Sequence, residues 1–200
     1  MIGAMQMRRH LAAAVLLVVA GCSQSPPTEF YTLSSMQLPP GGLSTPKTVV
    51  GVGPVTLPDY LDRPQIVTRA SGNRVMLADF DSWIEPINSM FTRVLVQNLS
   101  VLLVSDNVMS LPQRRATPLD YQVEVDVTRF DADATGRAVL DSRWRVYGEG
   151  GERLIEEGRS TIVESAVEPS DYEAVVASMS KALAQMSRAI ASVIETHRSG

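Results

Sequence analysis

The chain has 200 residues, of which 18 are Lys or Arg and 22 are Asp or Glu, so its net charge at pH 7 is −4. An acidic chain without a basic run does not favour binding to nucleic acid or to anionic lipid. One cysteine, Cys22, and two histidines, His10 and His197, exclude an internal disulfide and give little material for a Cys/His metal site. We therefore expect neither a metal nor nucleic acid among the ligands.

The N-terminal segment has the features of a bacterial lipoprotein signal. Arg8 and Arg9 precede an apolar run over residues 11–20, which as a helix is about 15 Å long, roughly half of a bilayer core. The run ends in Val19-Ala20-Gly21-Cys22, which resembles the lipobox, whose cysteine receives a diacylglycerol and an N-acyl chain. Residues 1–21 are then a removable signal, and Cys22 carries a covalent lipid but no other cofactor. The next residue is Ser23, at a position where lipoproteins that stay at the inner membrane usually have Asp. This resemblance favours the periplasmic face of the outer membrane.

The first part of the mature chain is expected to be a tether followed by strands. Residues 22–29 are polar and contain two prolines, so they form a short lipidated tether, and residues 30–200 form the periplasmic domain. A turn at residues 70–73 would join two strands into a hairpin. The expected strands cover residues 30–33, 48–55, 65–69 and 74–80.

A helix is predicted from Ser82, because Ser82 and Glu85 have the spacing of a capping box and Pro86 suits a first turn. Its apolar positions continue to about Leu99. Residues 101–104 are either a short buried strand or the end of this helix. Residues 105–118 are predicted to be a loop.

The second half predicts an antiparallel meander followed by a long helix. Alternating apolar and polar residues predict strands at 121–128 and 138–147, and shorter strands at 153–155 and 159–164. Ser170 and Glu173 again have capping-box spacing, and an apolar stripe then runs from Tyr172 to Val193. This stripe packs either on the sheet, which we favour, or on another copy of the chain. The expected fold is a single-domain α+β two-layer sandwich, a mostly antiparallel sheet packed against two main helices.

No catalytic motif accounts for the remaining polar residues. The pair Asp79 and Asp81 and the cluster Asp126, Asp131 and Asp133 could suggest calcium or paired-carboxylate chemistry, but Asp131-x-Asp133 lacks the spacing and the terminal glutamate of a calcium loop. A solvated turn explains Asp131 and Asp133 better. The sequence contains no nucleophile elbow, phosphate-binding glycine loop or zinc-protease motif, so we predict a protein that is not an enzyme.

The segment with the composition of a binding site runs from Val55 to Arg69, and its centre is a proline-stiffened loop at residues 57–64. Two prolines fix the backbone around an aromatic, an aliphatic and an arginine side chain, a combination typical of interaction hot spots. The alternative is that Tyr60 and Leu61 only cover the end of the sheet while Asp62 pairs with Arg63. Composition does not choose between the two. The candidate partner-binding residues are Tyr60, Leu61, Asp62, Arg63 and Pro64.

Three blocks of this sequence together resemble the PqiC-like family of auxiliary lipoproteins. The blocks are Phe30-Tyr31-Thr32-Leu33, Leu57-Pro58-x-Tyr60-Leu61-Asp62-Arg63-Pro64-Gln65-Ile66-Val67 and Trp83-x-Glu85-Pro86, and the similarity extends to Asp171-Tyr172 and Met179-Ser180. Ile84 and Ile87 stand where the family is expected to have Ala and Leu, a departure that we expect to change packing but not role.

The resemblance implies a non-catalytic lipoprotein subunit of an intermembrane lipid transport system of the MCE/ABC type. Its expected partners are an MCE-domain tunnel protein, docked at the outer membrane through the loop, and the outer-membrane lipid that holds the lipid anchor. A homo-oligomer is left open, because a tunnel can be symmetric. The alternative function is a stand-alone periplasmic lipoprotein that binds lipid or another hydrophobic ligand between sheet and helices.

Overall fold

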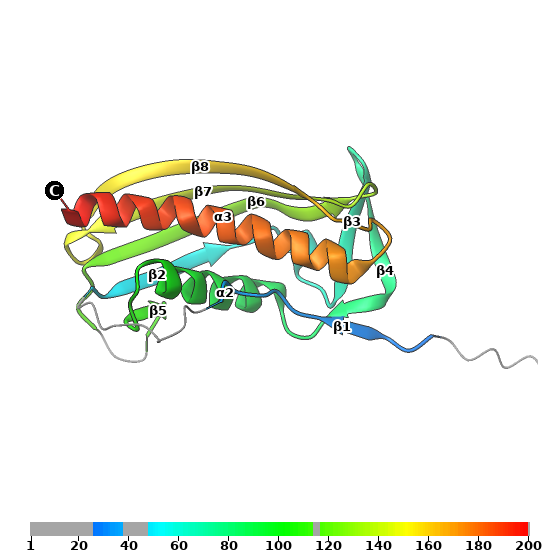
Figure 1. Ribbon diagram of the computed structural model, residues 1–200, viewed down its shortest axis with the longest axis horizontal. Helices are drawn as coiled ribbons and strands as arrows, with labels where there is room; N and C mark the ends of the chain where they lie inside the picture. The colour runs from blue at the N-terminus through cyan, green and yellow to red at the C-terminus, as the bar shows by residue number, and fades with distance from the viewer. Residues whose placement is uncertain (1–25, 38–47, 114–116, 200) are drawn as a thin grey trace, which may run out of the picture.

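A computed structural model describes residues 26–37, 48–113 and 117–199, which form one sheet with two helices packed on one of its faces (Figure 1). The expected α+β two-layer sandwich is confirmed. The strands are β1 (Glu29–Tyr31), β2 (Val50–Thr56), β3 (Gln65–Ser71), β4 (Arg74–Trp83), β5 (Val108–Ser110), β6 (Tyr121–Asp133), β7 (Arg137–Gly148) and β8 (Arg153–Ser165). The helices are α2 (Ile87–Leu102) and α3 (Tyr172–Ser199), with short 3-10 turns η1 (Asp59–Leu61) and η2 (Glu149–Gly151).

Strand β6 is the centre of the sheet. On one side it pairs with β7, which pairs with β8, and both ladders are long and antiparallel, as the predicted meander requires. The other side of β6 is shared by two strands, because β2 pairs in parallel with its first half and β3 pairs in parallel with its last residues. The sheet is therefore mixed: β1–β4 and β2–β5 are also parallel, whereas β3–β4 is an antiparallel hairpin.

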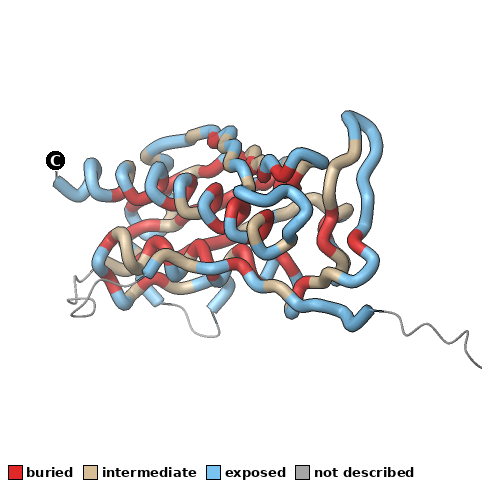
Figure 2. Tube along the Cα trace, turned by 45° about the vertical axis from the view of Figure 1, so that its right-hand side comes forward, coloured by how far each residue is buried: buried red, intermediate tan, exposed pale blue. Residues whose placement is uncertain are grey.

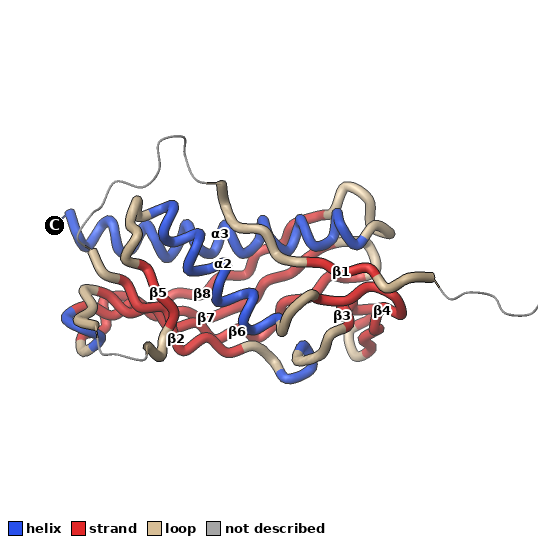
Figure 3. The backbone as a smooth tube through the Cα atoms, turned by 90° about the horizontal axis from the view of Figure 1, so that it is seen from below, coloured by secondary structure: helices blue, strands red, loops and turns tan. Residues whose placement is uncertain are grey.

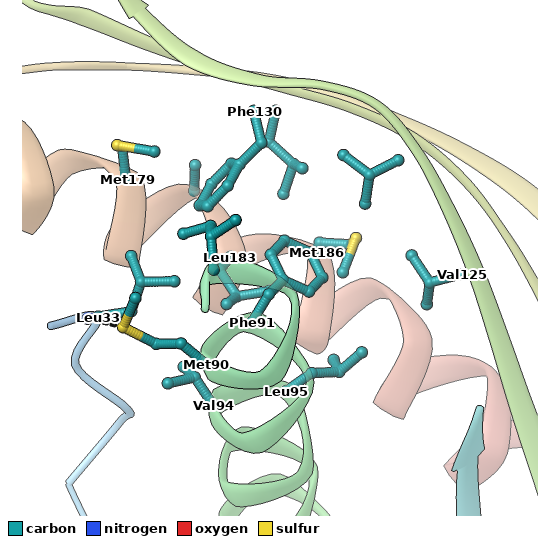
Figure 4. Close-up of a cluster of buried hydrophobic side chains, with 14 of the residues drawn as sticks. Leu33, Met90, Phe91, Val94, Leu95, Val125, Phe130, Met179, Leu183 and Met186 are labelled. Carbon is teal, nitrogen blue, oxygen red and sulfur yellow. Dashed lines mark hydrogen bonds between the residues drawn. The ribbon is translucent and has the colours of Figure 1, made fainter. Parts of the chain in front are cut away.

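The core lies between the sheet and the two helices (Figure 4). Phe91 of α2 meets Phe130 of β6 edge to face, with ring centroids 5.1 Å apart. From α3, Met179, Leu183 and Met186 point into the same cluster, and all three are buried. The apolar stripe of α3 therefore packs on the sheet, and its buried positions are not available to a second copy of the chain. Figure 2 shows the buried positions running along the facing sides of helices and sheet.

Both predicted capping boxes are wrong, for two different reasons. Ser82 pairs with Gln65 and Phe30 in the sheet, so β4 continues through the expected helix start. Strand β4 ends at Trp83, Pro86 has a non-helical backbone (ψ 128°), and α2 begins directly after it at Ile87 without a side-chain cap. At α3 the cap is Asp171, whose Oδ1 accepts a hydrogen bond from Glu173 N at 2.8 Å.

Three smaller differences come from contacts that are distant in the sequence. Val108–Ser110 forms strand β5 within the expected loop, because β2 offers it a parallel partner. Strand β8 is continuous, since β7 pairs with it along its length apart from one irregularity. His197, near the C-terminus, belongs to α3, and its ring nitrogens lie 3.1 Å from Tyr121 Oη and 3.1 Å from an Arg153 nitrogen.

Candidate functional site

The candidate loop connects the end of β2 to the start of β3. Thr56 of β2 pairs with Asp126, and Thr68 of β3 pairs with Ala132 of the same strand. Between these two pairings, the segment at residues 57–67 is longer than the segment of β6 at residues 127–131. It cannot follow β6 residue by residue, and its first part, the loop at residues 57–64, protrudes from the edge of the sheet and contains η1 (Figure 3).

Local hydrogen bonds make this loop a defined turn. Pro58 holds an extended conformation (φ −60°, ψ 138°) just before η1, and its carbonyl accepts from Leu61 N at 3.0 Å. Arg63 Nε donates to Tyr60 O at 2.7 Å and closes the turn from the other side. Leu61, a candidate partner-binding residue, is 4% exposed and belongs to the core, so the alternative in which it covers the sheet fits this side chain. Tyr60 is half-buried, and Asp62 is exposed.

A buried carboxylate, Asp131, fixes the loop to the sheet. Its Oδ2 accepts from Tyr60 Oη at 2.9 Å and from Arg69 at 2.8 Å, and its Oδ1 accepts from Arg129 at 2.8 Å. Asp131 is 0% exposed, so the expectation that it belongs to a solvated turn is wrong. That expectation fits only Asp133, which accepts bonds from the turn residue Thr135. A buried carboxylate needs such partners because desolvation of an unpaired charge is costly.

The environment of Tyr60 keeps its phenol protonated. Burial raises the pKa of Tyr60 to about 12, and the adjacent Asp131 carboxylate contributes in the same direction. The hydrogen bond to Asp131 likewise raises the pKa of Arg69, whose guanidinium carbon lies 5.9 Å from the centre of the Tyr60 ring. Tyr60 therefore acts here as a hydrogen-bond donor that joins the loop to Asp131 of the sheet.

The outer side of the loop faces a shallow cleft of about 300 Å³. The opposite wall is the end of β4 and its connection to α2, where Ile84 is 60% exposed and Trp83 is 5% exposed. A backbone hydrogen bond of 2.6 Å, from Trp83 N to Pro64 O, joins the two walls. The lining residues are Asp62, Arg63, Pro64, Trp83, Ile84, Glu85 and Pro86. Two sequence blocks that are separate in the chain thus form one surface.

The structure divides the predicted site residues and adds others. Asp62, Arg63 and Pro64 line the cleft, whereas Tyr60 and Leu61 hold the loop on the sheet. Among the ion pairs of the described residues, none joins Asp62 to Arg63, which the alternative interpretation expected.

Sequence reasoning missed Ile84 as a surface residue of the cleft and Asp131 as the residue that positions the loop. The sequence does contain a signal for Ile84, because this residue occupies the open position of the block Trp83-x-Glu85-Pro86. Ile84 changes the surface of the cleft rather than the packing, whereas the departure at Ile87 does lie in the core.

Several predictions fall on parts of the chain that the structure does not describe. The signal at residues 1–21 and the lipidated Cys22 lie outside the described residues, and the tether is described only from Pro26. No helix among the described residues is long and apolar enough to cross a membrane. In the same part of the chain, no group of three or more His, Cys, Asp or Glu side chains is placed to hold a metal ion.

Known proteins resemble this chain in both sequence and fold. "Intermembrane transport lipoprotein PqiC" of Escherichia coli (strain K12) and that of Shigella flexneri are each 28% identical over 150 residues, 72% of this chain and 76% of theirs. The crystal structure of an uncharacterized protein superposes with a TM-score of 0.69 at 22% identity, covering 84% of this chain and 99% of that one. A protein from Xanthomonas campestris superposes with a TM-score of 0.65 at 16% identity, covering 86% and 100%. Both structural matches support the fold alone.

The family assignment comes from the match to a family model. The model of the ABC-type transport auxiliary lipoprotein component matches residues 31–191, which include strands β2 to β8, the loop, the cleft and most of α3. The chain therefore belongs to the family of ABC-type transport auxiliary lipoproteins.

Proposed function

We propose that this chain is a non-catalytic subunit of an intermembrane lipid transport system of the MCE/ABC type. It docks the periplasmic end of an MCE-domain tunnel protein at the outer membrane, where acylated Cys22 holds it on the periplasmic face. The contact surface is the cleft between the loop at residues 57–64 and residues 83–86, which connect β4 to α2. Transport itself, and any energy for it, belongs to the other components.

The main support for this proposal is that two segments distant in the sequence, residues 62–64 and 83–86, line one exposed cleft. An apolar residue on the surface, Ile84 at 60% exposure, lies beside a proline-rigid loop that bears Arg63. Rigid loops lose little conformational entropy on binding, and apolar and arginine side chains are frequent binding hot spots. The buried Asp131 contacts support the proposal further, because they hold the loop in one position before the partner arrives.

A stand-alone lipid-binding lipoprotein is the weaker alternative. A ligand between sheet and helices would need space there, and Phe91, Leu95 and Met186 fill it with no exposed surface. An apolar groove of about 420 Å³ at the edge of the sheet, lined in part by Pro54, Leu111 and Leu119, is where a hydrophobic ligand would have to bind. Lipid that co-purifies with the protein, and that is lost when this groove is filled by a larger side chain, would favour this alternative.

The docking surface is tested by substitution of Ile84. In the full-length lipidated protein, Ile84→Asp places a charge in the cleft while the backbone bond from Ile84 N to Tyr31 O is kept. We expect capture of the MCE-domain protein from solubilised envelopes to weaken about 30-fold, which corresponds to a hot spot of about 2 kcal/mol. Leu154→Asp is the matched control, because Leu154 is 49% exposed on β8, away from the cleft.

Each result of this test has one meaning. Loss of capture by Ile84→Asp with normal capture by Leu154→Asp supports the cleft as the docking surface. Undiminished capture by Ile84→Asp overturns that assignment, and the absence of any MCE-domain protein from the wild-type sample overturns the proposed function. A separate mass measurement of the mature N-terminus tests the lipid on Cys22.

A further inference from the structure

One strand of the sheet carries a run of apolar side chains that no part of the described protein covers. On β4, Val75 is 43% exposed, Met76 55%, Leu77 42% and Phe80 38%. These are large side chains close together on a hairpin, whereas the rest of the described surface has such residues mostly singly. A concentration of this kind on a protein surface indicates contact with a partner or a membrane.

Within the described residues, no strand pairs with the outer edge of β4 over this run. Strand β1 pairs with β4 only from Asp81 to Trp83, and the hairpin partner β3 lies on the other side. Before β1 the chain contains Pro26 and Pro27, which lack the N–H groups needed to continue the parallel ladder along β4. The two prolines therefore end the β1–β4 ladder, and among the described residues nothing covers the apolar side chains of β4.

The apolar run lies at the end of the molecule from which the tether leaves. Figure 1 shows β1, the β3–β4 hairpin and the turn before α3 at one end, with the C-terminus at the other. Two further exposed apolar residues belong to this end, namely Phe30 at 62% exposure and Val167 at 93%. Cys22 is four residues before Pro26, so the lipid lies within about 14 Å of the described chain even if those residues are extended.

We propose that the exposed apolar run of β4 is a second membrane contact, which rests on the surface of the same bilayer that holds the lipid on Cys22. The length of the tether carries this choice of partner, because it keeps this end of the domain beside the bilayer. The chain is acidic, so the contact is with apolar and zwitterionic parts of the lipid rather than with anionic headgroups.

The chemistry of the hairpin limits how deep this contact is. The free N–H and C=O groups of the β4 edge would be unsatisfied in hydrocarbon, so the strand stays at the headgroup level. Arg74, next to the run, can extend its guanidinium to the headgroups, while Asp79 keeps the far end of the run in water. Val75 and Leu77 lie on one face of the strand and Met76 on the other, so all three reach the acyl boundary together because β4 meets the bilayer with its free outer edge.

Such a contact gives the lipidated domain a fixed orientation. A single flexible tether would leave the domain free to rotate, whereas a tether and a hairpin hold it at two points. The cleft that we propose for the MCE-domain protein would then face one direction. The inference rests on lipidation of Cys22 but not on the identity of the transport partner.

The contact can be measured with a fluorescent probe in the full lipidated protein. Because the lipid consumes the thiol of Cys22, Met76→Cys introduces one reactive thiol, which is labelled with the environment-sensitive dye NBD. The protein is reconstituted in vesicles of phosphatidylethanolamine and phosphatidylglycerol that contain spin-labelled lipid as a quencher. Leu154→Cys is the matched control, since Leu154 has a similar exposed fraction and lies near Arg153 and His197 at the opposite end.

We expect the probe at position 76 to shift its emission to the blue and to be quenched by the spin-labelled lipid, and the probe at position 154 to do neither. Equal behaviour of the two probes overturns the proposal. The proposal is also overturned if the emission of the probe at position 76 shifts to the blue only after the MCE-domain protein is added. The hairpin is then a protein-binding surface. Protein that does not float with the vesicles lacks the lipid anchor and removes the basis of the inference. Loss of docking in Ile84→Asp leaves this measurement unaffected.

Discussion

The sheet consists of two regions that are built differently. The body, formed by β2, β5, β6, β7, β8 and both helices, has long antiparallel ladders and a continuous core. The arm, formed by β1, β3 and β4, has short pairings and a strand whose residues 74–77 are all exposed. The body contributes most of the core, whereas the arm carries the exposed apolar side chains of β4. The proposed binding surfaces lie on the arm and at its junction with the body.

The largest contrast is expected between a body residue and an arm residue of similar chemistry. Phe91→Ala removes a ring with no exposed surface and leaves a cavity against Phe130, so the free energy of unfolding should fall by about 3–5 kcal/mol. Met76→Ala removes a side chain that is 55% exposed and should change the same quantity by less than about 0.5 kcal/mol. Urea denaturation followed by circular dichroism measures both. Equal losses would show that the arm is part of the cooperative core.

The next effect concerns the junction between arm and body. Asp131→Asn keeps the shape of the side chain but removes the charge that Tyr60, Arg69 and Arg129 contact. We expect the free energy of unfolding to fall by about 1.5–3 kcal/mol, the usual value of hydrogen bonds to a charged group. Hydrogen exchange should show the loop at residues 57–64 opening more than the β6–β7 ladder. Uniform loss of protection in both would contradict a local role for Asp131.

Much of the body could be predicted from the sequence because its pattern is local. Strands β6 and β7 alternate apolar and polar residues, and the stripe of α3 recurs with helical spacing, so each element is recognisable without its neighbours. The errors lie where a distant partner decides. Ser82 has a helix-start pattern, yet its pairing with Phe30 and Gln65 makes it part of a strand. Val108–Ser110 becomes a strand only because β2 is beside it.

The candidate site could be predicted only in part for the same reason. Prolines and composition identified the loop at residues 57–64, but burial depends on what lies beneath each side chain. Leu61 enters the core, and Asp131, which appeared to be a solvated acid, is covered by two arginines and Tyr60. That Ile84 faces Pro64 across a cleft depends on the meeting of β4 with the loop. Periodicity carries no information about such a meeting.

Glycines give a further comparison of the two regions. A methyl group on Gly158 of β8 would overlap the indole ring of Trp144, whereas one on Gly72, in the β3–β4 turn, would meet no atom within 4 Å. Gly158→Ala should therefore lower the free energy of unfolding by about 1–3 kcal/mol through overpacking, and Gly72→Ala should leave it nearly unchanged. Thermal unfolding of the two variants checks this. A tolerated Gly158→Ala would mean that Trp144 moves freely in its site.

The smallest effect is expected at the β6–β7 turn, at the junction of body and arm. Asp133 lies there at the end of β6, opposite Arg69 of β3 in the register of the two strands. Burial alone would raise the pKa of Asp133, but hydrogen bonds from Thr135 and Arg137 outweigh it and lower the pKa to about 2. An unfolded Asp has a pKa of about 3.9, so the unfolded chain binds this proton first as the pH falls. The stabilisation from Asp133 is therefore complete above about pH 4 and is lost as the pH falls towards 2.

Because this side chain is near the surface, we expect Asp133→Asn to cost on the order of 1 kcal/mol at pH 7, less than the substitutions in the body. The difference from the wild type should shrink as the pH is lowered from about 4 to 2 in urea titrations. Asp79→Asn, at an exposed position of the arm, serves as the control and should change stability little at either pH. A difference for Asp133→Asn that stays constant with pH would mean that the turn depends on the shape of this side chain and not on its charge.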